Sequence, residues 1–200
     1  MDEYSAGAVK YGFWFNEFDQ LIRWVLDGTS DQSIKDQLQD GVFLKQKSRQ
    51  RSLNVTSRLL TRIHSLTTEL QKLYPDLDRD NQRLLVLISI MNTDRLIHDF
   101  MITCFKDAVV LGDERLQDYE LDAFFTRMQA THESIAKWQD QTITRLKGTI
   151  RNYLRESGIV RSEGDDLVLR RPLLDPRLID ALVNASLQEY LVTFTGRTYE

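Results

Sequence analysis

The segment from Thr142 to Glu156 has residue types and spacing that could contact nucleic acid. At about 100° per residue, its apolar side chains fall on one helix face and a polar stripe falls on the opposite face. The polar side of this segment holds Thr144, Arg145, Lys147, Gly148, Arg151, Asn152 and Arg155. Arginines supply phosphate contacts, and Arg, Asn and Thr also reach base edges in the major groove. The alternative interpretation is an ordinary solvated helix face.

Gly148 lies in the middle of this predicted helix. A glycine there costs about 1 kcal/mol relative to alanine, so the position invites a reason. Close approach of a phosphate group to the backbone is one such reason.

A second basic segment, residues 41–68, carries six basic residues and no acidic residue. Its basic residues are Lys45, Lys47, Arg49, Arg51, Arg58 and Arg62. The first four alternate along the chain near the expected start of a helix, where positive charge opposes the helix macrodipole unless an anion binds there. They predict either a non-helical arm or contact with an anionic partner. An exposed flexible loop is the alternative.

The net charge of the chain hides this segregation. The 200 residues have a formal net charge of −4. Residues 141–162 contain five basic residues and one acidic residue, whereas residues 107–122 contain six acidic residues and one basic residue. Basic segments on an acidic body are typical of a protein that binds nucleic acid with one face.

Catalytic and metal-binding motifs are not found in the sequence. The single cysteine, Cys104, excludes an internal disulfide and a cysteine-based zinc site. There is no Gly-rich phosphate loop, no His-Glu-x-x-His and no Gly-x-Ser-x-Gly. His64, His98 and His132 fall on three separate predicted helices, each without a second His or Cys four residues later. We therefore expect a protein that is not an enzyme, with no metal, no cofactor and no small-molecule substrate.

The sequence also predicts where the protein acts. Its N-terminus is acidic where a secretory signal would be basic. The longest charge-free apolar stretch, Leu84 to Thr93, has ten residues, whereas a membrane span needs about 20. We expect a cytoplasmic protein that does not contact the membrane.

Apolar periodicity predicts helices almost throughout, so the expected fold class is mainly α. The predicted helices cover residues 13–27, 30–38, 48–73, 81–91, 94–110, 116–130, 131–138, 142–156 and 176–190, with Thr142 as the N-cap of the 142–156 helix. Residues 159–170 hold two β-prone runs around a turn and predict one short β-hairpin. Helix, turn, helix and hairpin is the order of a winged helix-turn-helix module. We expect a helical bundle over residues 1–137 and a winged-helix-like unit over residues 138–200, packed on the bundle.

The predicted hairpin has a turn that phosphate would repel. The turn reads Glu163-Gly164-Asp165-Asp166, and like charges at this place oppose contact with DNA. Arg161, Arg170 and Arg171 at the base of the hairpin are the better candidates for such contact.

Several short motifs occur in an order and spacing that resemble a known family. They are Ala6-Gly7-Ala8 before an aromatic-rich helix, Gly28-Thr29-Ser30, Lys47-Ser48-Arg49, and the run from Tyr153 to Val160. With them, residues 5–190 resemble the BrxA family of bacterial BREX phage-defence systems. The resemblance implies a helical bundle similar to the NusB-type antitermination fold, no known catalysis and an association with DNA binding. The basic residues that match the family motifs are Lys47, Arg49 and Arg155.

We therefore expect a non-catalytic component of a BREX system that binds double-stranded DNA mainly through phosphates. Its expected partners are duplex DNA and the other BREX proteins. Two alternatives stay open at this point. One is a protein–protein adaptor within the BREX complex, and the other is RNA binding of the NusB-like kind.

Overall fold

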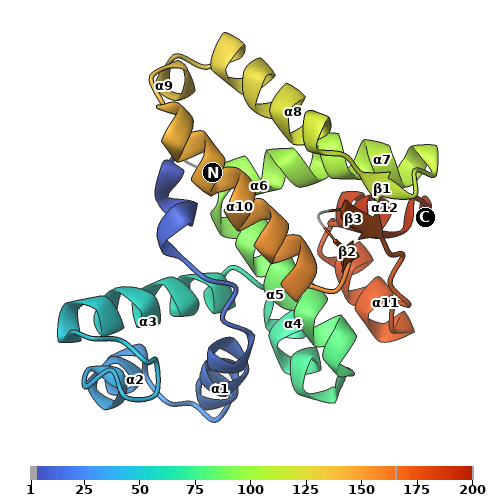
Figure 1. Cartoon of the computed structure of the whole chain (residues 1–200). Coiled ribbons are helices and arrows are strands. Elements are labelled where there is room, and N and C mark those ends of the chain that lie inside the picture. The colour runs from blue at the N-terminus through green and yellow to red at the C-terminus, as the bar shows by residue number, and fades with distance from the viewer. Residues whose placement is uncertain (1–3, 165, 200) are drawn as a thin grey trace.

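The computed structural model describes residues 4–164 and 166–199, so Asp165 of the predicted turn and the acidic first three residues lie outside it. Helices dominate these ranges, as the sequence predicts (Figure 1). In the first half they are η1 (Ala6–Lys10), α1 (Phe15–Leu26), α2 (Asp31–Leu38), α3 (Arg49–His64), α4 (Thr68–Leu73), η2 (Tyr74–Asp76) and α5 (Arg79–Thr93). The second half holds α6 (Arg95–Phe100), η3 (Met101–Phe105), α7 (Lys106–Leu111), β1 (Arg115–Leu116), α8 (Asp118–Thr131), α9 (Glu133–Ala136), α10 (Asp140–Glu156), β2 (Val160–Glu163), β3 (Asp166–Leu169), α11 (Pro176–Asn184) and α12 (Gln188–Thr195).

Short polar side chains fix the starts of several helices. Each accepts a hydrogen bond from the backbone N–H three residues later, which would otherwise have no partner in the first turn. These capping residues are Ser30 for α2, Ser48 for α3, Asp78 for α5 and Asp94 for α6. The helix starts at these places agree closely with the predicted ones.

Two predicted helices are each divided in the structure, and one predicted N-cap is wrong. The helix predicted over residues 48–73 is divided into α3 and α4, because Ser65 ends the first and the Thr67 hydroxyl caps the second by accepting from the Leu70 N–H at 3.3 Å. The helix predicted over residues 176–190 is divided into α11 and α12 by Ser186, whose φ is +58°. Thr142 is not an N-cap, since α10 begins at Asp140.

The helix predicted over residues 94–110 is continuous but contains a wider turn. Residues Met101–Phe105, labelled η3, form a π-helical turn between α6 and α7. Ile97, Met101, Phe105 and Val109 are all buried at four-residue intervals. On a regular helix each such step rotates the side chain by about 40°, and a π turn takes up part of that rotation. The turn therefore keeps these four side chains in the core.

The predicted hairpin forms, and it gains a third strand. β2 pairs with β3 antiparallel, with Val160 opposite Leu169 and Glu163 opposite Asp166. β1 pairs with the other edge of β3, giving the strand order β1-β3-β2. Figure 1 shows the sheet beside the end of α10. β1 precedes the predicted boundary at residue 137, so the sheet joins segments from both sides of it.

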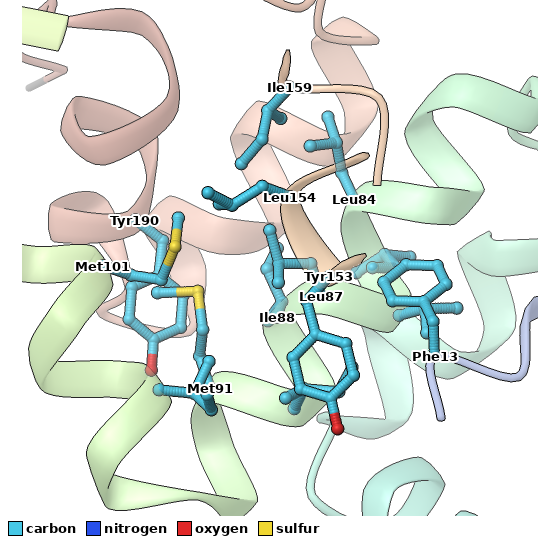
Figure 2. Packing of buried hydrophobic residues seen from close by; sticks show 14 of the residues in the cluster. Phe13, Leu84, Leu87, Ile88, Met91, Met101, Tyr153, Leu154, Ile159 and Tyr190 are labelled. Atoms are coloured by element: carbon cyan, nitrogen blue, oxygen red, sulfur yellow. The ribbon is translucent and has the colours of Figure 1, made fainter. Parts of the chain in front are cut away.

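The core has α5 at its centre and α10 against it. The α5 side chains from Leu84 to Met91 are all buried, on every face of the helix. Figure 2 shows Tyr153 of α10 next to Phe13, with ring centroids 6.3 Å apart. The apolar face predicted for α10 is confirmed, because Ile143, Leu146, Ile150, Tyr153 and Leu154 are all buried. This packing determines which face of α10 is left at the surface.

Over the same described ranges, none of the helices has both the length and the apolar character that crossing a bilayer requires.

Candidate nucleic-acid interface

The outward side of α10 carries the polar residues that the sequence places there. Arg145, Gly148, Asn152 and Arg155 are exposed, as is Thr144. Lys147 and Arg151 lie at the edge of this stripe, with only 22% and 25% of their side chains exposed. The stripe is therefore not uniformly open to a partner.

Helix α8 explains the partial exposure of these two cations. Asp118 and Asp122 lie one turn apart on α8, and each meets one basic side chain of α10. The Arg151 guanidinium is 2.5 Å from Asp118 Oδ1, and Lys147 is paired with Asp122. Surface ion pairs of this kind contribute about 0–1 kcal/mol. They lower the positive charge of the stripe.

Arg155 connects α10 to the hairpin. Its Nε donates to the Ser162 hydroxyl of β2 at 2.7 Å, and its side chain stays exposed. Arg161 is paired with Glu163 on its own strand. Arg170 is exposed just after β3 and makes no ion pair within the part of the chain described.

The acidic turn of the hairpin has a basic partner that sequence reasoning missed. Arg115 of β1 pairs with Asp166 and lies 3.5 Å from Glu163. Because β1 is two residues long, it has no periodicity that would have revealed this neighbour. The contact reduces the repulsion expected between this turn and a phosphate.

The first part of the N-terminal basic segment is exposed and unpaired. Lys45, Lys47, Arg49 and Arg51 are exposed, and none makes an ion pair with any residue of the described chain. Lys45 lies in a tight loop in which the Gln46 N–H donates to the Gly41 carbonyl at 2.9 Å, and the other three basic residues follow this loop. Ser48 then begins α3. The sequence alone is compatible with an arm, a loop or a helix start for these four basic residues. In the structure they lie in a short loop and at the start of α3.

Arg58 and Arg62 do not belong to this surface. Arg58 is half-buried: its Nη2 donates to the Thr93 carbonyl at 3.2 Å, and Asp94 is 3.7 Å away. Arg62 is 1% exposed, and its Nη1 donates to the Gly12 carbonyl at 2.9 Å. Burial lowers the pKa of Arg62. Both side chains therefore hold the interior together.

A short helix lies between the two basic regions. η1 packs against α10, and the Tyr153 hydroxyl of α10 donates to the Tyr11 carbonyl at 2.7 Å. On its other side, Lys10 of η1 lines a pocket together with Arg51 of α3. The structure thus places η1 between α10 and a pocket at the start of α3.

Each of the three histidines meets a nearby polar side chain. His98 and His132 are also linked through Tyr4, whose hydroxyl donates to Asp99 at 2.5 Å and whose ring centroid is 4.5 Å from that of His132. His64 Nε2 is 2.9 Å from Asp31, His98 Nδ1 is 3.0 Å from Asp99, and His132 Nδ1 is 2.8 Å from the Thr131 hydroxyl. In residues 4–164 and 166–199, no three His, Cys, Asp or Glu side chains are grouped to hold a metal ion.

Fold and surface together define a mainly helical protein with a small antiparallel sheet and exposed basic segments near two helices. A solved protein of Magnetospirillum magneticum, described as uncharacterized, has the same fold: the TM-score is 0.78 at 16% identity, over 98% of this chain and 100% of that one. The "BREX protein BrxA" of Bacillus cereus (strain H3081.97) is 28% identical over 166 residues, which is 83% of each chain. The chain belongs to the BrxA family, whose family model matches residues 2–186.

Proposed function

We propose that this protein binds duplex DNA through phosphate contacts, as a non-catalytic component of a BREX phage-defence system. One observation carries the DNA part: Lys45, Lys47, Arg49 and Arg51 are exposed together, without a carboxylate to neutralise them in the described chain. Clustered, unpaired cations are the feature that the phosphate backbone requires. Membership of the BrxA family and the name of the Bacillus relative support the BREX part.

The arrangement around α10 supports a second contact with DNA. The order β1, α8, α9, α10, β2, β3, with β3 in the middle of the sheet, is consistent with a winged helix-turn-helix module and supports this part of the proposal. In such modules the second helix enters the major groove. Arg145, Asn152 and Arg155 are the exposed residues of α10 that would meet phosphates or base edges there.

The sequence supports a non-catalytic role, because it holds no Gly-rich phosphate loop, no His-Glu-x-x-His and no Gly-x-Ser-x-Gly.

A mobility-shift titration of the full-length protein tests DNA binding. The ligands are duplex DNA, duplex RNA and single strands, at low and moderate salt. Two charge reversals are compared, Lys47→Glu/Arg49→Glu and Arg145→Glu/Arg155→Glu. The matched control is Arg23→Glu/Lys72→Glu, which makes the same charge change at exposed positions on α1 and α4.

We expect each test variant to bind duplex DNA at least about tenfold more weakly than the control. We also expect the slope of log affinity against log salt to fall by about 0.9 for each phosphate that the variant no longer neutralises. Binding that is equal in all variants, or absent at low salt, would contradict the proposal. Preference for single-stranded RNA would favour the NusB-like alternative.

Exposed apolar side chains support the adaptor as a second candidate. Leu111 at the end of α7 is 77% exposed, and Leu173 is 91% exposed. A hydrogen bond links the segment that holds Leu173 to α7, since Arg171 Nη2 donates to the Val109 carbonyl at 3.0 Å. Under this alternative, Leu111→Ser/Leu173→Ser abolishes co-purification with the other BREX proteins and leaves duplex DNA binding unchanged.

A further inference from the structure

An open pocket lies between the start of α3 and the segment that joins η1 to α1. Its volume is about 590 Å³, within the range of about 300–1,000 Å³ that accommodates small-molecule ligands. The charged, polar and aromatic residues that line it are Lys10, Tyr11, Trp14, Gln46, Arg51 and Asn54.

One wall of this pocket is fixed from the interior of the protein. The buried Arg62 donates to the carbonyl of Gly12, and Tyr153 donates to the carbonyl of Tyr11. The Arg62 guanidinium also lies 5.4 Å from the Trp14 ring centre. The backbone of this wall is therefore held in one position before any ligand arrives, which lowers the entropy cost of binding.

The same wall contains a strained residue. Trp14 has φ +56° and ψ +48°, in the left-handed region, and this costs a bulky residue about 1–2 kcal/mol. Strain of this kind gathers at ligand-binding places. Gly12 is required beside it, because a Cβ there would lie 2.7 Å from the indole nitrogen of Trp14.

The lining residues combine three kinds of chemistry. Tyr11 and Trp14 offer aromatic surface, on which nucleic-acid bases stack. Lys10 and Arg51 offer positive charge for a phosphate. Gln46 Nε2 donates to the Leu44 carbonyl and Asn54 Oδ1 accepts from Gln50. The Gln46 amide oxygen can still accept a hydrogen bond and the Asn54 amide nitrogen can still donate one, as the polar edges of a base require. No carboxylate is among the described residues that line the pocket.

We propose that this pocket binds a nucleoside phosphate, with its base beside Tyr11 and Trp14 and its phosphate at Lys10 and Arg51. The chemistry is the same for a free mononucleotide and for the terminal nucleotide of a strand. An acidic peptide would use the two cations, but it would leave the aromatic and amide groups without a purpose. This site goes beyond the phosphate contacts of a duplex, because it recognises the base as well.

The test uses the full-length protein and four kinds of probe. These are the mononucleotides AMP, GMP, CMP and UMP; inorganic phosphate; a 5′-phosphorylated single strand; and a glutamate-rich peptide. Binding is followed by calorimetry and by tryptophan fluorescence. The variants are Arg51→Gln and Asn54→Ala, both at exposed positions, and Arg23→Gln is the control.

We expect saturable binding of at least one mononucleotide, with inorganic phosphate binding more weakly. Arg51→Gln should weaken mononucleotide binding at least about tenfold, the loss typical of one charge-assisted hydrogen bond. Asn54→Ala should change the order of preference among the four bases, and Arg23→Gln should behave as the wild type. If only the phosphorylated strand binds, with the same dependence on Arg51, the ligand is a strand end.

Two results would overturn the nucleotide site. One is the absence of binding by every mononucleotide and by the strand at millimolar concentration. The other is binding that Arg51→Gln and Asn54→Ala leave unchanged, or that only the acidic peptide shows. Failure of this site is distinguishable from failure of duplex binding, because Lys47→Glu/Arg49→Glu changes residues that do not line the pocket.

Discussion

At the scale of single residues, Arg62 shows how little its sequence neighbourhood says about its role. It belongs to a run of basic residues that predicts an exposed surface, yet its side chain is buried. Its hydrogen-bond partners within the described chain are the carbonyls of Gly12 and Phe13 and the hydroxyl of Tyr153, all neutral groups. Charge alone could not separate it from Arg51, because the separation depends on which helix face packs inward.

We predict that Arg62→Leu lowers the free energy of unfolding by about 3 kcal/mol, because it leaves buried carbonyls without a donor. Urea unfolding followed by circular dichroism measures the change. Arg23→Leu, at an exposed arginine paired with Asp19 on the same helix, should cost less than about 1 kcal/mol. Equal effects of the two substitutions would show that Arg62 has no special structural role.

Cys104 gives a second prediction at this scale. Burial raises the pKa of its thiol to about 12, so at pH 8 only about one thiol in ten thousand is ionised. We predict that iodoacetamide alkylates the folded protein very slowly at pH 8 and the protein unfolded in guanidinium rapidly. Intact-protein mass spectrometry measures both rates, and similar rates would contradict the burial of this thiol.

At the scale of elements, most helices could be predicted, and the errors have local causes. The starts of α2, α3 and α6 follow from polar residues in front of apolar periodicity. The break between α3 and α4 was missed, because the stripe of leucines continues across Ser65 and Thr67. β1 was missed because a two-residue strand forms only where β3 offers it a partner.

The candidate interface was predictable only in part for the same reason. The outward face of α10 follows from its own periodicity, but its acidic neighbours on α8 belong to a separate element. From the sequence alone, the buried and exposed faces of a helix are easier to predict than which other helix packs beside it.

The ion pairs between α8 and α10 lead to a prediction about affinity. Asp118→Asn/Asp122→Asn releases Arg151 and Lys147 and removes two negative charges from the expected interface. We predict tighter binding to duplex DNA, with a salt slope steeper by up to about 1.8 if both cations then meet phosphates. The control is Asp36→Asn/Asp80→Asn, at exposed acidic positions on α2 and α5. Unchanged affinity would mean that this side of α10 does not face DNA.

Gly148 permits a test in which stability and binding move in opposite directions. A Cβ at this exposed helical position meets nothing within 4 Å, so Gly148→Ala should raise the free energy of unfolding by about 1 kcal/mol. If a phosphate approaches the backbone there, the same substitution weakens duplex binding. Gly28→Ala is the contrasting variant. A Cβ at Gly28 is also unobstructed, but the φ of +82° there makes alanine destabilising, so this substitution should lower the free energy of unfolding.

At the scale of the whole molecule, the part of the chain before residue 137 and the part after it pack against each other at several places. The sheet takes β1 from before residue 137 and β3 from after it, α10 packs on η1, and α11 packs on α4. Each of these contacts crosses the predicted boundary between the bundle and the C-terminal unit.

We therefore predict that the protein unfolds in a single cooperative transition. Urea curves from tryptophan fluorescence and far-ultraviolet circular dichroism should coincide. Trp14 and Trp24 report on the N-terminal helices, and Trp138 reports on the region just before α10. Two separate transitions would instead show that residues 1–137 and 138–200 are independent domains.

The π turn between α6 and α7 has a consequence for chain length. It spaces Ile97, Met101, Phe105 and Val109 by four residues each, all buried. Removing one residue between Met101 and Phe105 would change the spacing to four, three and four, which an ordinary α-helix keeps on one face. The helix is thus one residue longer than its packing requires. A single-residue deletion at this turn leaves the apolar face continuous, whereas a deletion within the uninterrupted α5 would rotate half of its side chains away from their neighbours.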